Sequence, residues 1–212
     1  MTLELGVLVS GSGTNLGAIL AAVAERRLDA RVRLVVSNKA DAKGLDRARA
    51  VGVPTAVVPH GAFPTRQAFD EELVRVLRAA NVEWVVLAGF MRVVTPVLLD
   101  AFRDRVVNIH PALLPAFPGV DAQAQALAYG VKITGCTVHF VDAGVDTGPI
   151  ILQEAVPVLD TDDRAALAAR VLEREHELLV RALGLIAAGR VQIGAPDERG
   201  RRRVSIGGPP AA

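Results

Sequence analysis

The sequence predicts an α/β fold with a doubly wound, mostly parallel sheet, followed by an antiparallel extension and a long helix. Up to about residue 130, apolar runs of strand length alternate with longer segments of helical period. Several of these runs are apolar throughout, as strands covered on both faces must be. After Gly130 two apolar runs follow each other with no helix between them, which indicates antiparallel pairing.

The alternating part supplies the strands and helices of the predicted parallel sheet. The strand candidates cover residues 5–10, 32–37, 55–58, 84–88 and 105–109. Helix candidates lie between them, at about 14–26, 40–51, 65–80 and 96–103. The last of these begins with Thr95 as its cap and Pro96 in its first turn. Right-handed crossovers between successive strands then give the doubly wound arrangement.

The C-terminal part has a different rhythm. We expect "ITGCTVHFV" and "PIILQEAVPV" to form the antiparallel strands, and a long helix to cover about residues 161–188. A weak hairpin, "RVQIGAPDERGRRRVSI", closes the chain. The terminal "GGPPAA" is expected to be disordered.

Composition restricts the class of protein. The 212 residues include 24 Lys and Arg against 23 Asp and Glu, so there is no overall field to attract nucleic acid or an anionic membrane. We interpret the basic run "RGRRR" as a solvated terminus. A single cysteine, Cys136, cannot form an internal disulfide, and the first residues hold neither a basic leader nor an apolar run of membrane length. We therefore expect a cytoplasmic protein.

A Gly-rich loop, "SGSGTN" at residues 10–15, joins the first strand to the first helix. Its glycines allow backbone N–H groups to face an anion, and the helix N-terminus adds partial positive charge. A tight turn without a ligand is the alternative. A dinucleotide would require a glycine where Leu16 stands, and an acidic residue where Ser37 and Asn38 stand. The loop therefore favours one phosphate on a mononucleotide-sized ligand over NAD.

Asn108 and His110 lie at the carboxyl end of the last predicted strand of the alternating part, residues 105–109. Residues two apart on extended backbone point to the same side, and the carboxyl edge of an open α/β sheet is where ligands bind. Asn can donate to a developing oxyanion and His can exchange protons near neutral pH. Prolines at 111, 115 and 118 stiffen the following loop, and the Leu114–Pro115 bond is a candidate for the cis form. Local bonding to the backbone, without catalysis, is the alternative interpretation.

Three carboxylates are candidates for a role beside His110 or at a ligand. Asp142 and Asp146 share the glycine-rich loop "VDAGVDTGPII". A carboxylate beside an imidazole orients it and favours its charged form, so Asp146 is the candidate partner of His110. Asp142 is expected to cap a turn. Glu175, on or beside the apolar stripe of the long helix, either reaches solvent or accepts hydrogen bonds from ligand hydroxyls.

Other conspicuous residues have a structural interpretation. His60 lies in a loop, and His139 alternates with apolar residues as a strand histidine packing behind the site. Cys136 is interpreted as a small core residue. Phe90 and Met91 pack at the sheet edge or line an apolar cleft. The sequence shows no metal-ligand spacing and no motif of covalent catalysis.

The sequence resembles the phosphoribosylglycinamide formyltransferases, which are folate-dependent enzymes of purine synthesis in the formyltransferase family. The resemblance rests on four motifs that occur in the order found in that family: "SGSGTN", "AGFMRVVTP", "NIHPALLPAFPG" and "VDTGPII". The resemblance covers about residues 3–195, and "SNKADAKGLDRA" adds to it. It implies a Rossmann-like formyltransferase domain over residues 1–195. Its phosphate-binding half is expected at about 1–105, its catalytic and folate-binding half at about 106–195, and a tail at 196–212.

The resemblance also implies the site residues. The catalytic triad would be Asn108, His110 and Asp146. The substrate phosphate would lie on Gly13, Thr14 and Asn15, and the ribose on Glu175. The residues implied for folate are Arg66, Met91, Arg92, Val93, Val94, Val141 and Val145.

The reaction that the resemblance implies is direct formyl transfer from 10-formyltetrahydrofolate to the amine of glycinamide ribonucleotide. No metal and no covalent enzyme intermediate would take part, and the enzyme would be a monomer or homodimer binding neither nucleic acid nor membrane. Some members carry a histidine where Val120 and Asp121 stand, and often a basic residue where Ala116 stands. These departures leave the triad unchanged.

Two alternatives remain open at this point. Formyltetrahydrofolate deformylase is a hydrolase with the same triad and an additional domain before the catalytic one. The related methionyl-tRNA formyltransferase carries an additional C-terminal barrel. From a different class, a non-catalytic nucleotide-binding module would explain the Gly-rich loop but not the triad. A nicotinamide-dependent oxidoreductase fits "SNKAD" poorly.

Overall fold

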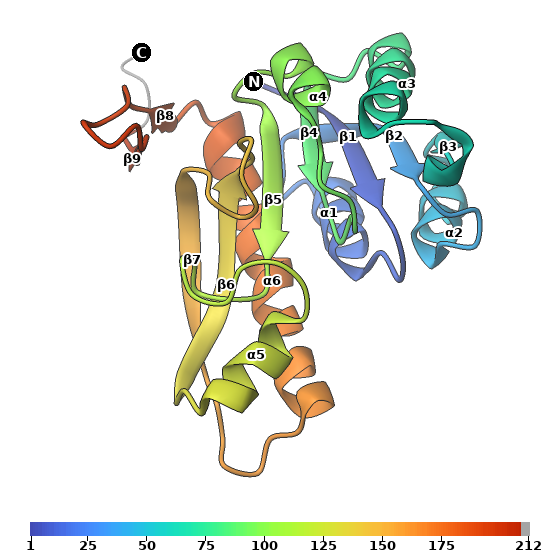
Figure 1. The fold of residues 1–212 in the computed structure, drawn as a ribbon. Helices are drawn as coiled ribbons and strands as arrows, with labels where there is room; N and C mark the ends of the chain where they lie inside the picture. The colour runs from blue at the N-terminus through green and yellow to red at the C-terminus, as the bar shows by residue number, and fades with distance from the viewer. Residues whose placement is uncertain (209–212) are drawn as a thin grey trace. The chain divides into compact units, whose positions relative to one another are not determined.

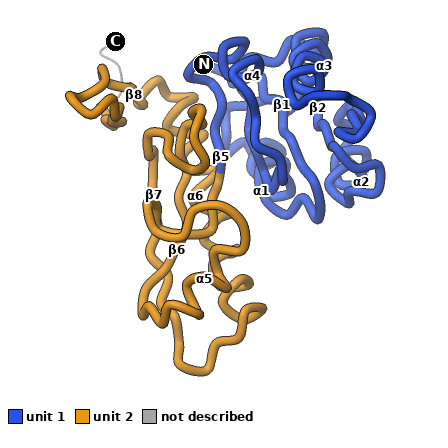
Figure 2. Tube along the Cα trace, viewed as in Figure 1, with its two compact units in different colours: residues 1–108 blue, residues 109–212 orange. Residues whose placement is uncertain are grey.

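The computed structural model describes residues 1–208 and contains a seven-stranded sheet of order β3-β2-β1-β4-β5-β6-β7 (Figure 1). The chain divides into two compact units, residues 1–108 and the chain from residue 109 onward (Figure 2). Strand β5 (Val106–His110) contains the boundary between them. The predicted doubly wound, mostly parallel fold is confirmed.

The first unit is the alternating part of the chain. Its strands pair in parallel, and β1 is almost completely buried, as expected for a strand covered on both faces. Helix α1 packs against α2, and α3 packs against α4. One pair of helices therefore covers each face of the parallel part of the sheet (Figure 1). The elements are β1 (Leu3–Val9), α1 (Thr14–Ala24), β2 (Ala30–Ser37), α2 (Lys43–Ala50), β3 (Thr55–Val57), the 3-10 helix η1 (His60–Ala62), α3 (Arg66–Ala79), β4 (Trp84–Leu87) and α4 (Pro96–Ala101).

The second unit holds the antiparallel extension. Strands β6 (Ile133–Phe140) and β7 (Ile150–Pro157) pair antiparallel, and the long helix α6 (Arg164–Ala187) packs on both. Helix α5 (Ala122–Tyr129) packs beside α6, and β8 (Val191–Ile193) pairs with β9 (Val204–Ile206) as a hairpin.

A bidentate ion pair holds the connection from β7 to α6. Both Arg170 Nη atoms lie 2.7 Å from the Asp162 carboxylate oxygens, and Nη1 also donates to the Pro157 carbonyl at 3.0 Å. The Arg170 bonds and the backbone N–H of Leu159 lower the pKa of Asp162 to about 2. Asp163 then caps α6 by accepting from Ala166 N–H at 2.7 Å.

The sequence predicted these elements to within a few residues, with three differences. Helix α5 and η1 were not predicted, and β5 extends to His110 rather than ending at 109. The predicted hairpin is confirmed. The expectation of disorder concerned residues 207–212, and most of these, 209–212, lie outside the described residues. Within residues 1–208 no helix combines the length and the apolar character that crossing a membrane requires.

Candidate active site

The Gly-rich loop (residues 10–15) makes a sharp turn between β1 and α1. Gly13 caps α1 in the left-handed conformation, with φ 64°. A Cβ at this position would lie 2.5 Å from the Cα of Gly44, at the start of α2. Gly44 N–H donates to the Gly11 carbonyl at 3.0 Å, and Arg47 Nε donates to the Ser12 carbonyl at 2.8 Å. The close approach of two backbones explains why both positions are glycine.

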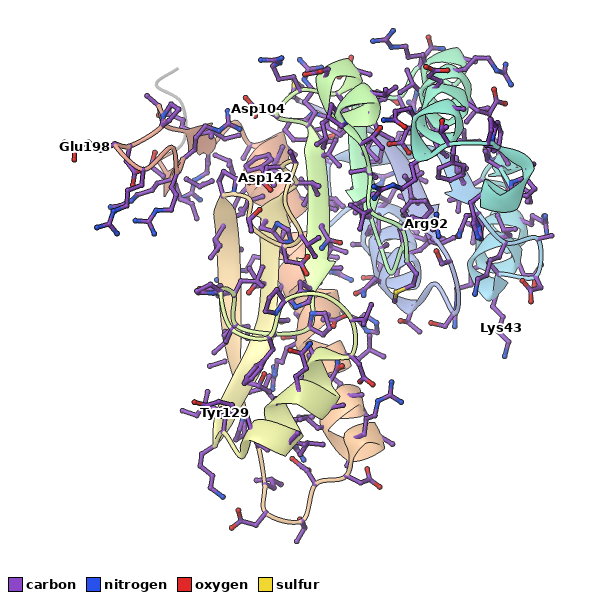
Figure 3. All side chains as sticks on the ribbon, in the orientation of Figure 1. Lys43, Arg92, Asp104, Tyr129, Asp142 and Glu198 are labelled. Atoms are coloured by element: carbon purple, nitrogen blue, oxygen red, sulfur yellow. The ribbon has the colours of Figure 1, made fainter. Side chains whose placement is uncertain are left out.

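The segment after β4, residues 91–94, belongs to the same unit. Met91 and Val93 are 70% and 47% exposed, whereas Val94 is buried. Arg92 lies in the loop after β4 (Figure 3). The structure therefore presents alternate side chains of this segment to solvent.

Asp70 of α3 anchors the end of that segment. Its Oδ2 accepts from Thr95 N–H at 2.5 Å and from Thr95 Oγ1 at 2.8 Å. Burial raises the pKa of Asp70 above its ordinary value, although the Thr95 bonds and the charges of Arg66 and Arg92 oppose this. The two predicted folate-binding arginines thus both act on this carboxylate.

In the second unit the structure brings His110 and Asp146 together. His110 is buried, and its Nδ1 lies 3.3 Å from Asp146 Oδ2. Its Nε2 lies 2.8 Å from the Phe117 carbonyl oxygen. Both ring nitrogens therefore face oxygen acceptors, an arrangement that a doubly protonated ring satisfies completely.

Asp146 also contacts a second histidine. Its Oδ1 lies 3.6 Å from Nε2 of the buried His139, while its Oδ2 accepts from Gly119 N–H at 2.8 Å. Burial by itself raises the pKa of Asp146, but His139, the Gly119 bond and the charge of His110 outweigh it. The net result is a pKa below the usual range. The carboxylate is thus held in its charged form.

The loop at residues 111–119 is fixed by side chains of the β6–β7 pair. Thr137 Oγ1 donates to the Ala112 carbonyl at 2.6 Å and accepts from Leu114 N–H at 3.1 Å. Gln153 Nε2 donates to the Leu114 carbonyl at 2.9 Å. The Leu114–Pro115 bond is cis, as the sequence suggested. This fixed loop carries both Phe117 and Gly119 to the histidine–carboxylate pair.

The loop between β6 and β7 contains the remaining predicted residues. Asp142, labelled in Figure 3, caps a turn as expected, because its Oδ1 accepts from Gly144 N–H at 3.1 Å and from Thr147 Oγ1 at 2.6 Å. Val141 is half-buried, and Val145 is 49% exposed.

Glu175 does not reach solvent. It is 7% exposed on α6, so the interpretation as an exposed edge residue of the apolar stripe is wrong. Burial, followed by the nearby charge of Glu175, raises the pKa of the Cys136 thiol to about 12, which makes this cysteine unreactive. His60 is part of η1, with Nδ1 3.2 Å from Asn38 Nδ2.

Sequence reasoning missed the contacts made by Phe117 and Gly119, and it placed His139 only behind the site. His139 and Thr137 are two apart on β6 and share a face, which is the signal that could have linked them to the site. Phe117 and Gly119 contribute backbone groups, which residue identity does not reveal. Among residues 1–208 there is no cluster of three or more His, Cys, Asp or Glu that could bind a metal.

Comparison with known proteins shows which family the chain is similar to. The formyl transferase family matches residues 4–183. The chain is 41% identical to phosphoribosylglycinamide formyltransferase from Escherichia coli, covering 90% of each chain. It is 47% identical to the trifunctional purine biosynthetic protein adenosine-3 of Drosophila pseudoobscura pseudoobscura, over 88% of this chain but 14% of that protein. The chain thus spans a small part of such trifunctional relatives.

Solved structures give the same result. Glycinamide ribonucleotide transformylase 1 from Symbiobacterium toebii matches with a TM-score of 0.93 and 52% identity, covering 98% of this chain and 95% of that one. A formyltetrahydrofolate deformylase from Pseudomonas syringae matches with a TM-score of 0.88 and 25% identity, covering 98% of this chain and 67% of that one. The family match and the identity over nearly all of both chains lead to one conclusion: this chain belongs to the formyl transferase family.

Proposed function

We propose that this chain transfers the formyl group of 10-formyltetrahydrofolate to the amine of 5-phosphoribosylglycinamide, in de novo purine biosynthesis. The observation that carries the proposal is the 3.3 Å contact between His110 Nδ1 and Asp146 Oδ2, both shielded from solvent, in a member of the formyl transferase family. His110 follows Asn108 on strand β5. The names of the Escherichia coli and Symbiobacterium toebii relatives identify the acceptor.

The proposed chemistry is a direct transfer. The substrate amine attacks the formyl carbon, the carbonyl oxygen becomes an oxyanion, and the bond from that carbon to the folate nitrogen then breaks. Asn108 and protonated His110 donate to the oxyanion, since they are two apart on a strand and so share a side. His110 Nε2 would exchange the Phe117 carbonyl for this oxygen. Asp146 holds His110 and helps to move the amine proton to the departing folate nitrogen.

The remaining predicted residues are assigned to binding. The backbone of Gly13, Thr14 and Asn15 would hold the phosphate at the start of α1, and the Glu175 carboxylate would accept from ribose hydroxyls. The proposed folate contacts are Arg66, Met91, Arg92, Val93, Val94, Val141 and Val145. We place the activity in the cytoplasm, with small molecules as its partners. Whether the enzyme is a monomer or a homodimer stays a prediction for solution measurements.

The test follows formylated product and free formate together, with and without glycinamide ribonucleotide. Product that forms only with the amine present supports the transferase. Formate released at the same rate without the amine would instead mean a hydrolase, the activity named for the Pseudomonas syringae structure.

The catalytic assignment is tested by His110→Ala and Asp146→Asn. Each is expected to lower kcat by about 100-fold or more, because an oxyanion donor or its orienting charge is lost. Affinity for the phosphate-carrying substrate should stay nearly unchanged. Asp142→Asn is the matched control, since it makes the same change in the same loop and keeps the Oδ1 acceptor of its turn. Equal turnover in Asp146→Asn and Asp142→Asn would remove Asp146 from the mechanism.

A further inference from the structure

Ser10, the first residue of the Gly-rich loop, connects that loop to the segment after β4. Its backbone N–H donates to the Gly89 carbonyl at 3.1 Å, and its Oγ accepts from Met91 N–H at 2.9 Å. The side chain is buried, with 6% of the residue exposed. One bond therefore joins Ser10 to Met91, the first residue of the 91–94 segment, and the other joins it to Gly89 just before that segment.

A third bond fixes the direction of the hydroxyl. Ser10 Oγ donates to Asn38 Oδ1 at 2.6 Å, in a buried position after β2. With its proton directed to Asn38, the Ser10 oxygen has a lone pair for Met91 N–H. The amide of Asn38 is oriented in turn, because its Nδ2 lies 3.2 Å from His60 Nδ1. The hydroxyl is therefore held in the orientation that accepts from Met91.

The far end of the segment is held independently of Ser10. Asp70 accepts from both Thr95 N–H and Thr95 Oγ1. Between these two anchors, Met91 and Val93 expose 70% and 47% of their surface. The segment thus has a backbone hydrogen bond at each end and presents the side chains of Met91 and Val93 to solvent between them.

We infer that Ser10 is a positioning residue that couples binding of the phosphate-carrying substrate to the Gly-rich loop with binding of the folate substrate to the 91–94 segment. The inference rests on the proposed function for the identity of the two ligands. Its structural basis is the set of Ser10 bonds, all of which lie within the first unit.

The physical argument concerns the cost of ordering. A ligand that orders the Gly-rich loop also restrains Ser10, and through Ser10 the backbone of Met91. The second ligand then has less conformational freedom to remove, so each ligand tightens binding of the other by the same factor. Coupling of this kind is typically about fivefold or more.

The first experiment measures the Kd of glycinamide ribonucleotide by calorimetry, with and without saturating tetrahydrofolate. Tetrahydrofolate carries no formyl group, so the ternary complex cannot react. For the unmodified chain we expect about fivefold or tighter binding when tetrahydrofolate is present. In Ser10→Ala the ratio of the two Kd values should fall to near one.

A matched control separates this effect from a general loosening of the sheet edge. Ser37→Ala removes another fully buried strand-end hydroxyl, which accepts from Lys39 N–H at 3.1 Å. The Kd ratio in this control should equal that of the unmodified chain. If the Kd ratio falls to near one in Ser37→Ala as well as in Ser10→Ala, the role of Ser10 is overturned.

Hydrogen exchange supplies a readout that a change in overall stability would not give. In Ser10→Ala the Met91 amide should exchange faster, while the Thr95 amide, held by Asp70, keeps its rate. Kinetically, KM for the formyl donor should rise more than kcat falls, because no group at the reacting atoms changes. If Ser10→Ala does not fold, Asn38→Ala, which removes the hydroxyl's orienting acceptor, should give a smaller loss of the same coupling.

The outcomes distinguish the two proposals. Coupling that persists unchanged in folded Ser10→Ala or Asn38→Ala, or that is absent from an active unmodified chain, overturns the inference and leaves the proposed function intact. An unmodified chain that binds neither ligand and transfers no formyl group overturns the proposed function itself.

Discussion

Asp146 adopts a left-handed backbone conformation, with φ 55°, and it is not a glycine. Such a conformation costs about 1–3 kcal/mol and persists only where surrounding contacts determine it. Here Gly119 N–H and His110 Nδ1 lie against one carboxylate oxygen and His139 Nε2 against the other. The strained backbone and its contacts together fix the direction of the carboxylate toward His110.

His139 is the residue whose removal tests this arrangement. His139→Asn keeps a polar side chain but removes the contact with Asp146 Oδ1. Since His139 helps to hold the pKa of Asp146 low, the variant raises that pKa, and Asp146 becomes protonated at a higher pH. The acid limb of the pH profile of kcat/KM should therefore move upward. We expect kcat near neutral pH to fall by about tenfold. This corresponds to about 1.4 kcal/mol, near the lower end of the free energy contributed by a hydrogen bond to a charged group.

Val138→Ala provides the control for that experiment. Val138 is fully buried on the same strand, and its side chain points to the opposite face. Its truncation should reduce the free energy of unfolding by about 1–3 kcal/mol without moving the pH profile. A pH profile of His139→Asn identical to that of the unmodified chain would show that His139 only packs.

At the scale of the elements, the Gly-rich loop approaches α2 so closely at Gly13 that no room is left for a side chain. Gly13→Ala places a Cβ 2.5 Å from the Gly44 Cα, in a left-handed conformation that alone costs about 1–2 kcal/mol. The backbone of one element must therefore move away from the other. We expect the free energy of unfolding, measured by urea denaturation, to fall by more than the conformational cost alone.

Gly11→Ala is the matched comparison for stability. A Cβ at Gly11 meets nothing within 4 Å, and the residue is not among those with positive φ. Its unfolding free energy should stay within about 0.5 kcal/mol of the unmodified value. Equal losses in the two variants would mean that the contact with α2 contributes nothing.

At the scale of the whole molecule, the sequence predicted the fold because several strands of its parallel sheet lie in runs that are apolar throughout, and because segments of helical period separate these runs. Helix α5 was not predicted, because its sequence is "AQAQALAY" and its buried residues, Ala122 and Ala126, are too small to mark an apolar stripe. The pairing of His110 with Asp146 was predictable from the chemistry of an imidazole and a carboxylate.

Other parts of the site could not be read from residue types. The Phe117 carbonyl and Gly119 N–H are backbone groups, placed by a loop with positive φ at both residues. The Ser10 bonds join residues far apart in the sequence through the order of the strands, which a periodic pattern does not specify.

The hydrophobic core ends before the last hairpin. Within the described part of the chain, no residue from 191 to 208 is buried, whereas Leu183 and Ile186 of α6 are. A chain ending at Gly189 should therefore keep its fold and its formyl-transfer rate, with a Tm lower by no more than about 2–4 °C. A chain ending at Val180 should fail to fold, because it loses both of those side chains, each worth about 2–5 kcal/mol. Calorimetric melting and the transfer assay check both chains. A Tm far lower for the chain ending at Gly189 would mean that the hairpin, although exposed, contributes to the stability of the second unit.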